Sequence, residues 1–323
     1  MSVLVYIDHN NGTFKKNALE AINYASKTAA SVGGEVVALV LGTVSDSELA
    51  TLGKYGAQKV LKLDNSQYNH FNAKAFSKAI EVAANETGAS VIIFSANNNG
   101  KALAPMVAAQ LKAGLVAGAV DYPDTSNGFK VKKSVFSGKA FAHVAINTDK
   151  KVVSVTPNSF AVTEGGVDAT IANLNYSVND SDFSTQFISE DVIKGEVPLN
   201  EAERVVSGGR GLKGPENWGI LEDLAKAMDA SLACSRPVAD ADWRPHHEHV
   251  GQTGGTIRPN LYVAVGISGA IQHLAGVNAS KVIVVINKDP EAPFFKAADY
   301  GIVGDAFEIL PKLTEAVKKA KGN

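Results

Sequence analysis

Fully apolar runs alternate with amphipathic helical segments along this chain, and this alternation constrains the fold more than any other feature. In the first half, apolar runs at 3–8, 35–42 and 90–96 alternate with helical patterns at 17–30 and 73–88. A strand that is apolar on both faces needs cover on both faces, which a parallel sheet between two helix layers provides. The first half is therefore predicted to be an α/β domain with a parallel sheet.

The pattern changes after residue 127. Residues 128–147, 150–160 and 168–178 resemble consecutive strands separated by turns. Consecutive strands joined by short turns are typical of antiparallel pairing. The first domain is therefore predicted to end in an antiparallel extension.

A polar segment rich in Ser and Asp, residues 179–191, follows this extension. Such a composition is typical of a linker between domains. We therefore expect an N-terminal α/β domain over 1–190 and a second domain over 191–323.

The second domain shows the same alternation of strands and helices. Expected strands lie at 204–209, 231–235, 261–267, 281–287 and 301–305, and expected helices at 216–230, from Ser268, at 293–300 and at 306–320. Five strands in a βα alternation are the pattern of a doubly wound fold. The predicted fold is thus α/β throughout, with the doubly wound domain second.

Charge and composition exclude several classes of protein. The 323 residues carry 31 Lys and Arg against 33 Asp and Glu, a formal net charge of -2, so no basic surface for nucleic acid or an anionic membrane is expected. The apolar stretch 103–120 contains Gln110 and Lys112, so we do not expect a membrane-embedded protein. The single cysteine and the absence of a basic, signal-like start favour the cytoplasm.

Polar residues follow the expected strands of the second domain, where doubly wound folds bind their ligands. These residues are Arg210, Ser235, Arg236, Ser268, Gln272, His273, Asn287 and Asp305. The loop at 207–212, "SGGRGL", lacks the G-x-G-x-x-G spacing of a dinucleotide fingerprint, so a standard NAD site is not expected.

Three other features allow more than one interpretation. Cys234 beside Arg236 could be an activated thiol, but its place at the end of an apolar strand favours a packed core cysteine. The segment "NNNG" at 97–100 could contact a nucleotide, although helix capping is sufficient to explain it. The segment "HHEH" at 246–249 could suggest zinc, but it lacks the helical i, i+4 spacing of a metalloprotease, and we expect no metal site.

Five segments of the second domain together resemble the electron transfer flavoprotein alpha subunit family, bacterial type. They are "SGGRGLKGPEN" (207–217), "CSRPVAD" (234–240), "VGQTG" (250–254), "GISGAIQHLAG" (266–276) and "INKDPEAPFFKAADYGIVGD" (286–305), in that order. The first domain resembles the family more loosely, chiefly at 100–118.

The resemblance implies an electron carrier, with FAD as its cofactor and no catalytic residues of its own. Electrons would pass from acyl-CoA and other dehydrogenases, as in fatty acid β-oxidation, to a membrane quinone oxidoreductase. The chain would form a heterodimer with a smaller beta subunit that carries AMP, and its domain at 1–190 would contact that partner.

The resemblance also implies a set of residues that contact FAD. They are Arg210, Ser235, Arg236, His249, Val250, Gly251, Gln252, Thr253, Ser268, Gly269, Ala270, Ile271, Gln272, His273, Asn287, Asp305 and Ala306. Arg236 would lie against the flavin ring, Thr253 near N5 and His273 near O2. A helix N-terminus, a permanent cation and a donor imidazole there would favour the negative charge that a reduced flavin gains.

One loop departs from the family pattern, and two other functions compete with the electron carrier. The family usually has an Asn-Asp type loop before V-G-Q-T-G and a Lys after it, where this chain has His246 to His249 and Gly255. Of the implied contacts with FAD, that of His249 is the one that this departure affects. The competing functions are a flavin-dependent enzyme with its own small substrate, which would turn over without partner proteins, and a binding protein with a vestigial pocket.

Overall fold

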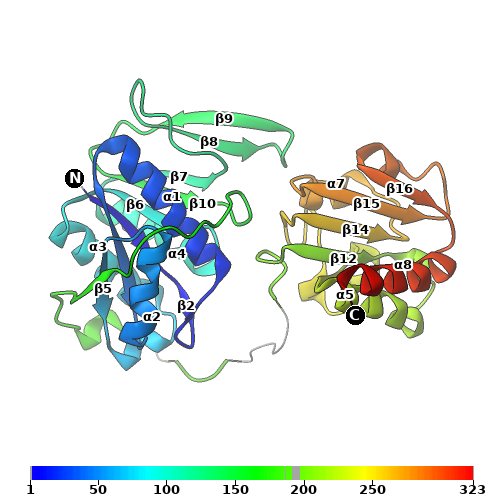
Figure 1. The fold of residues 1–323 in the computed structure, drawn as a ribbon, viewed down its shortest axis with the longest axis horizontal. Helices are drawn as coiled ribbons and strands as arrows, with labels where there is room; N and C mark the ends of the chain where they lie inside the picture. Colours follow the sequence, from blue (N-terminus) through cyan, green and yellow to red (C-terminus); the bar gives the residue numbers. More distant parts are fainter. Residues whose placement is uncertain (1, 186, 191–196, 323) are drawn as a thin grey trace. The chain divides into compact units, whose positions relative to one another are not determined.

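The chain folds as two compact units, one of which contains residues 2–135 and 140–190 and the other residues 197–322 (Figure 1). The computed structural model describes residues 2–185, 187–190 and 197–322. Residues 191–196 of the expected linker lie outside the described residues. The domain boundary between 190 and 191 stays a prediction.

The first unit is built on a nine-stranded sheet with the order β11-β5-β4-β1-β6-β10-β7-β8-β9. Its strands are β1 (Ser2–Tyr6), β4 (Glu35–Leu41), β5 (Lys59–Leu63), β6 (Ala89–Ser95), β7 (Gly114–Ala119), β8 (Lys130–Val135), β9 (Ala140–Ala145), β10 (Lys151–Val155) and β11 (Thr170–Asn173). The pairs from β11 to β7 are all parallel. The predicted parallel α/β domain is confirmed.

The antiparallel extension is smaller than predicted, because only β8 and β9 belong to it. β10 instead lies between β6 and β7 and runs parallel to both, and β11 pairs in parallel with β5 at the sheet edge. Four of the five β10 residues are buried, as in a strand covered on both faces, whereas β9 alternates half-buried and exposed residues. The prediction that residues 150–160 and 168–178 continue the antiparallel extension was wrong.

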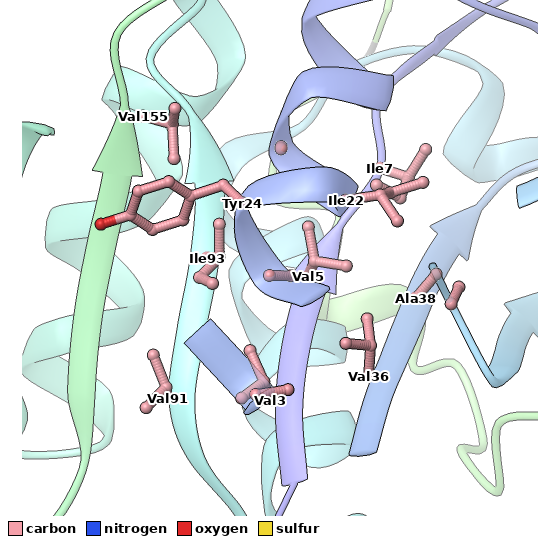
Figure 2. Close-up of a cluster of buried hydrophobic side chains, with 14 of the residues drawn as sticks. Val3, Val5, Ile7, Ile22, Tyr24, Val36, Ala38, Val91, Ile93 and Val155 are labelled. Atoms are coloured by element: carbon pink, nitrogen blue, oxygen red, sulfur yellow. The ribbon is translucent and has the colours of Figure 1, made fainter. Parts of the chain in front are cut away.

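Helices cover both faces of the first sheet. Ile22 and Tyr24 of α1 (Lys16–Val32) lie in one buried cluster with Val3 and Val5 of β1 on one face of the sheet (Figure 2). On the other face, α3 (Ala73–Glu86) and α4 (Asn98–Gln110) pack against Leu4. Burial of each such aliphatic side chain contributes about 1.5–3 kcal/mol. The smaller elements are β2 (His9–Asn10), β3 (Thr13–Phe14), α2 (Asp46–Thr51) and the 3-10 turns η1 (Leu52–Tyr55), η2 (Ser66–Asn69) and η3 (Asp180–Asp182).

The second unit has a five-stranded sheet in which every pair is parallel, with the order β13-β12-β14-β15-β16. Its strands are β12 (Arg204–Gly208), β13 (Ser231–Cys234), β14 (Leu261–Val265), β15 (Val282–Asn287) and β16 (Tyr300–Val303). The strand order reverses between β12 and β14. This arrangement confirms the predicted doubly wound fold.

Helices cover both faces of this sheet as well. α5 (Gly219–Met228) and α8 (Ala306–Lys321) lie side by side on one face, and α7 (Ile271–Val277) packs on the other (Figure 1). The remaining elements are α6 (Arg236–Ala239) and the 3-10 turns η4 (Arg210–Leu212), η5 (Pro215–Asn217), η6 (His246–Glu248) and η7 (Pro293–Ala297).

Two helix predictions in this unit were wrong in extent. α7 begins at Ile271, not at Ser268, because Gly269 has φ +84° and a Cβ there would lie 2.4 Å from Cβ of Phe294. The segment 293–300 forms only the turn η7, since the N–H of Asp299 already donates to the carbonyl of Ile283 (2.9 Å) and returns the chain to the sheet.

Candidate functional site

A cavity of about 450 Å³ lies in the second unit at the carboxyl ends of β12, β13 and β14. It is lined by Arg210, Ser235, Arg236, Pro237, His249, Val250, Gly251, Gln252, Thr253, Gly266, Ile267, Ser268, Gly269, Ala270, Gln272 and His273. The strand order reverses between β12 and β14, and doubly wound folds bind their ligands at the carboxyl ends of the strands beside such a reversal. The volume is within the range of roughly 300–1,000 Å³ that small-molecule and cofactor pockets have.

Glycines bring the loops that follow β12 and β14 into backbone contact. The N–H of Gly211 donates to the carbonyl of Gly266 (3.1 Å), and a Cβ on Gly209 would lie 2.2 Å from that oxygen. Gly266 itself has φ +61°, a left-handed conformation that favours glycine. Side chains at these positions would push the two loops apart, so the cavity depends on this glycine contact.

The segment 249–253 forms another part of the wall, between β13 and α7. The N–H of Val250 donates to the carbonyl of Cys234 (3.1 Å), and that of Gln252 donates to the carbonyl of Gln272 (2.7 Å). Gly276 of α7 packs on Gly251, where an added Cβ would lie 2.5 Å from the Gly251 backbone. The wall is thus held on both sides by backbone groups.

A buried ion pair stabilises the same segment from its N-terminal side. Glu248 is 3% exposed, and its two carboxylate oxygens accept hydrogen bonds from Nε (2.8 Å) and Nη2 (2.6 Å) of Arg244. Arg244 also donates to Glu222 (2.9 Å). Both oxygens of the Glu248 carboxylate therefore already accept hydrogen bonds from Arg244. Among the described residues, no three His, Cys, Asp or Glu side chains form a group that could hold a metal ion.

His273 lies on the cavity wall and is nine-tenths buried, with 7% exposed. Its Nε2 is 2.8 Å from the hydroxyl of Tyr262 on β14. Burial, and secondarily the neighbouring His249, lower the pKa of His273 to about 4, so the imidazole is neutral near pH 7. Its Nδ1 is buried and has no hydrogen-bond partner within the described part of the chain.

Permanent positive charge at the cavity comes from arginine. The Arg236 side chain is 62% exposed, and its Nε donates to Asp240 (3.2 Å) one helical turn further along. His249 does not add a cation at neutral pH, because burial first, and then the nearby Arg236 and His246, lower its pKa, against an opposing effect of Asp240. The site thus combines fixed cations with neutral imidazoles.

Thirteen of the seventeen predicted cofactor contacts line this one cavity, and four do not. Ile271 is 61% exposed at the start of α7, and Ala306, the first residue of α8, is buried in the core. Asn287 donates to the carbonyl of Ile267 (3.0 Å), and Asp305 caps α8 by accepting from the N–H of Phe307 (3.0 Å). Asn287, Asp305 and Ala306 have structural roles here. Contact with a cofactor stays a prediction for all four, as it does for the thirteen.

Three lining residues and one residue behind them were not predicted from the sequence. Pro237, Gly266 and Ile267 line the cavity and lie within the segments that carry the family resemblance. Tyr262 lies behind the wall. A tyrosine in a fully buried parallel strand was the available signal, because its hydroxyl needs a partner.

Cys234 is a packed core residue, as the sequence predicted. Its side chain is fully buried in the cluster formed with α5 and α8. Burial, and then the nearby carboxylate of Glu248, raise the pKa of the thiol to about 12. The cysteine is therefore an unreactive thiol near neutral pH.

The donor groups of this cavity fit FAD. The buried Nδ1 of His273 can donate to a ring carbonyl, and Arg210 and Arg236 offer charge to an electron-rich ring or a pyrophosphate.

Comparisons with known proteins cover both units. Residues 3–178 match the model of the electron transfer flavoprotein domain, and residues 198–278 match that of the electron transfer flavoprotein FAD-binding domain. Electron transfer flavoprotein subunit alpha of Bacillus subtilis is 38% identical over 320 residues, which is 98% of this chain and 97% of that protein. The subunit alpha of Pseudomonas aeruginosa is also 38% identical, over 98% of this chain and 100% of its own length.

A third relative, subunit alpha of Thermoanaerobacterium thermosaccharolyticum, is 36% identical over 99% of this chain and 98% of its own length. Among the described residues, no helix has both the length and the apolar character needed to cross a membrane. The family models and these full-length relatives agree: the chain belongs to the electron transfer flavoprotein alpha subunit family, and its cofactor is FAD.

Proposed function

We propose that this chain is the alpha subunit of a cytoplasmic heterodimer that carries electrons from acyl-CoA and other dehydrogenases to a membrane quinone oxidoreductase. The observation that carries the proposal is the cavity at the strand-order reversal, with fixed cations and an unpartnered imidazole nitrogen among the residues described. The relatives are named as electron transfer proteins, which supports a carrier over an enzyme with its own substrate.

Bound FAD supplies the redox chemistry through its isoalloxazine ring. The residues of this chain bind and orient it. Arg210 and the glycine-rich loops would hold the cofactor, and Arg236 would place a permanent cation beside the ring. Because an arginine keeps its charge at any physiological pH, it favours the negative charge that reduction adds.

The beta subunit of the proposed heterodimer would carry AMP and would contact the first unit. We expect co-expression with a beta subunit to give a one-to-one complex with one FAD. Reduction of this complex by an acyl-CoA dehydrogenase with its substrate, followed by reoxidation with a quinone oxidoreductase, would support the carrier. Sustained turnover of a small molecule by this chain alone would identify an enzyme instead.

Arg236→Ala tests the role of the cation within this function. Loss of one positive charge beside the ring should lower the reduction potential of the bound flavin. The expected change corresponds to about 1–3 kcal/mol. Lys226→Ala, on the exposed side of α5, removes a charge away from the cavity and serves as the control. Equal potentials for the two variants in spectroelectrochemistry would contradict the role of Arg236.

A further inference from the structure

His249 lies on the cavity wall with its imidazole held against two glycines. A Cβ on Gly254 would lie 2.8 Å from Cγ and Nδ1 of His249, and one on Gly251 would lie 3.5 Å from its Nε2. The backbone of His249 is fixed on both sides, because its N–H donates to the carbonyl of His246 (3.1 Å) and its carbonyl accepts from the N–H of Gly255 (2.8 Å). Close packing therefore sets the position of this ring.

The two imidazoles of the cavity differ in what their nitrogens contact. In His273, Nε2 lies 2.8 Å from the hydroxyl of Tyr262 and Nδ1 is fully enclosed. In His249, the ring makes no hydrogen bond to any residue that the structure describes, and its nitrogens are not enclosed in that way. A neutral imidazole has one nitrogen with a free lone pair, so His249 can take a proton without losing a hydrogen bond within this part of the chain.

The charged and titratable groups around His249 come from three elements. Arg236 and Asp240 lie at the two ends of α6, His246 lies on η6, and His273 lies on α7. Burial lowers the pKa of His249, Asp240 opposes this effect, and Arg236 and His246 add to it. The imidazole is therefore neutral near pH 7 while the cavity holds no added negative charge.

Negative charge in the cavity would shift this balance toward the protonated form of His249. Two unit charges about 6 Å apart, at an effective dielectric constant of ~20, change an equilibrium about a hundredfold, and a charge spread over a ring changes it about tenfold. Arg210 and Arg236 keep their protons in every state and cannot respond. The pKa of His273 starts at about 4, so that imidazole is harder to protonate near pH 7.

We propose that His249 takes up a proton from the solvent when the molecule in the cavity gains electrons. An external electron donor supplies the electrons, and the proton adds to the free lone pair of the imidazole. On reoxidation the electrons pass to the acceptor and the proton returns to the solvent. His249 belongs to the loop in which this chain departs from the family pattern. The proposal rests on the proposed function in one respect, that the bound cofactor is reduced and reoxidised.

NMR of the complex with the beta subunit, labelled with ¹³C-histidine, measures the protonation of His249 directly. The signal is assigned with His249→Gln and titrated in the oxidised and the dithionite-reduced states. We expect the pKa of His249 to rise by at least about one unit on reduction, which is tenfold tighter proton binding. His247, which is exposed on η6 and does not line the cavity, should titrate alike in both states. An unchanged pKa of His249 would overturn the proposal.

Potentiometry over a range of pH is the second measurement. The midpoint potential should fall with rising pH by about 30 mV more in the wild type than in His249→Gln, since a tenfold change equals about 30 mV for a two-electron couple. His247→Gln is the matched control and should behave like the wild type. Equal pH dependence in the wild type and His249→Gln would overturn the proposal.

The NMR titration is made on the wild type, so it decides the proposal even if His249→Gln binds FAD weakly. Both measurements reduce the flavin with dithionite or an electrode. Failure to exchange electrons with dehydrogenases would therefore contradict the proposed function and leave the proton uptake by His249 standing.

Discussion

Both units contain a parallel sheet whose strand order reverses, yet the two reversal points differ in what they offer a ligand. In the first unit the reversal lies between β1 and β6, and Asp8 follows β1. One oxygen of Asp8 accepts from the side-chain amides of Asn97 (3.0 Å) and Asn99 (2.9 Å) at the start of α4. These polar groups therefore satisfy one another.

In the second unit the reversal between β12 and β14 opens a cavity instead. His273 lines this cavity, and its buried Nδ1 has no hydrogen-bond partner among the described residues. Arg236, which also lines the cavity, has a side chain that is mostly exposed. The topology of both units thus provides a place for a ligand, and the residues at the strand ends decide whether that place is closed or available.

The largest expected effect comes from the buried ion pair beside the cavity. Arg244→Met leaves the Glu248 carboxylate buried without its cation and should lower the free energy of unfolding of the second unit by about 3–5 kcal/mol. The two tryptophans, Trp218 and Trp243, both lie in this unit, so tryptophan fluorescence in urea reports its unfolding.

Two further variants control this experiment. The added substitution Glu248→Gln should recover part of the loss, because it removes the orphaned charge. Lys78→Met, which breaks the surface pair with Glu81 (2.8 Å), should cost less than about 1 kcal/mol. A loss below about 1 kcal/mol in Arg244→Met would show that the pair does not support the cavity wall.

Acidification should act on the two units in opposite directions. In the flavin-free second unit, the pKa of His273 is about 4, whereas an unfolded histidine has a pKa of about 6.5. Between these values the unfolded chain binds a proton that the folded unit does not, so stability falls as pH falls, by about 3 kcal/mol at most. His273→Gln should remove this part of the pH dependence of urea unfolding followed by tryptophan fluorescence.

In the first unit the sign is reversed. Burial raises the pKa of Asp8, against the opposing hydrogen bonds from the two asparagines, and it also raises the pKa of Glu20. The folded unit therefore binds protons before the unfolded chain does, and these groups add stability as pH falls through their folded pKa values. Far-UV circular dichroism of the urea transition should show this gain. Parallel pH dependence in both units would contradict the comparison.

A smaller effect should follow from closing the cavity wall. Gly276→Ala places a Cβ 2.5 Å from the backbone of Gly251, and overpacking of this kind costs about 1–3 kcal/mol. We expect weaker FAD binding in calorimetric titration, with the first unit unaffected. Gly219→Ala in α5 is the matched control, since its Cβ would meet nothing within 4 Å. Equal FAD affinity in both variants would mean that this wall does not shape the site.

The smallest effect is expected at the closed reversal point. Asp8→Asn keeps an oxygen that can accept from Asn97 and Asn99, so the free energy of unfolding should change by less than about 1 kcal/mol. Asp8→Leu leaves both amides without that acceptor and should cost about 1–3 kcal/mol. Chemical denaturation checks both, and FAD affinity should not change in either. Loss of FAD from the complex with Asp8→Asn would contradict the assignment of the closed site.

Local pattern predicted most elements and most of the cavity wall. The uniformly apolar strands were recognisable, and the polar segments after them meet because parallel strands end at one edge. The "NNNG" segment caps α4 as predicted, with Oδ1 of Asn97 accepting from the N–H of Gly100 (2.8 Å).

What the sequence did not predict depends on contacts between distant residues. The position of β10 between β6 and β7 depends on which strands pair. The start of α7 at Ile271 instead of Ser268 depends on Phe294 packing beside Gly269. Tyr262 looks like any core residue until His273 is found at its hydroxyl. Local periodicity contains none of this information.

The most direct test of the account is amide hydrogen exchange of the heterodimer with and without FAD, read by mass spectrometry. We expect protection by FAD in peptides that cover 207–213, 235–237, 249–253 and 266–273, around the cavity at the ends of β12 and β14. We expect no change at 8–15 or 97–101, the closed reversal point of the first unit. Protection at those first-unit segments, or none around the cavity, would contradict the account.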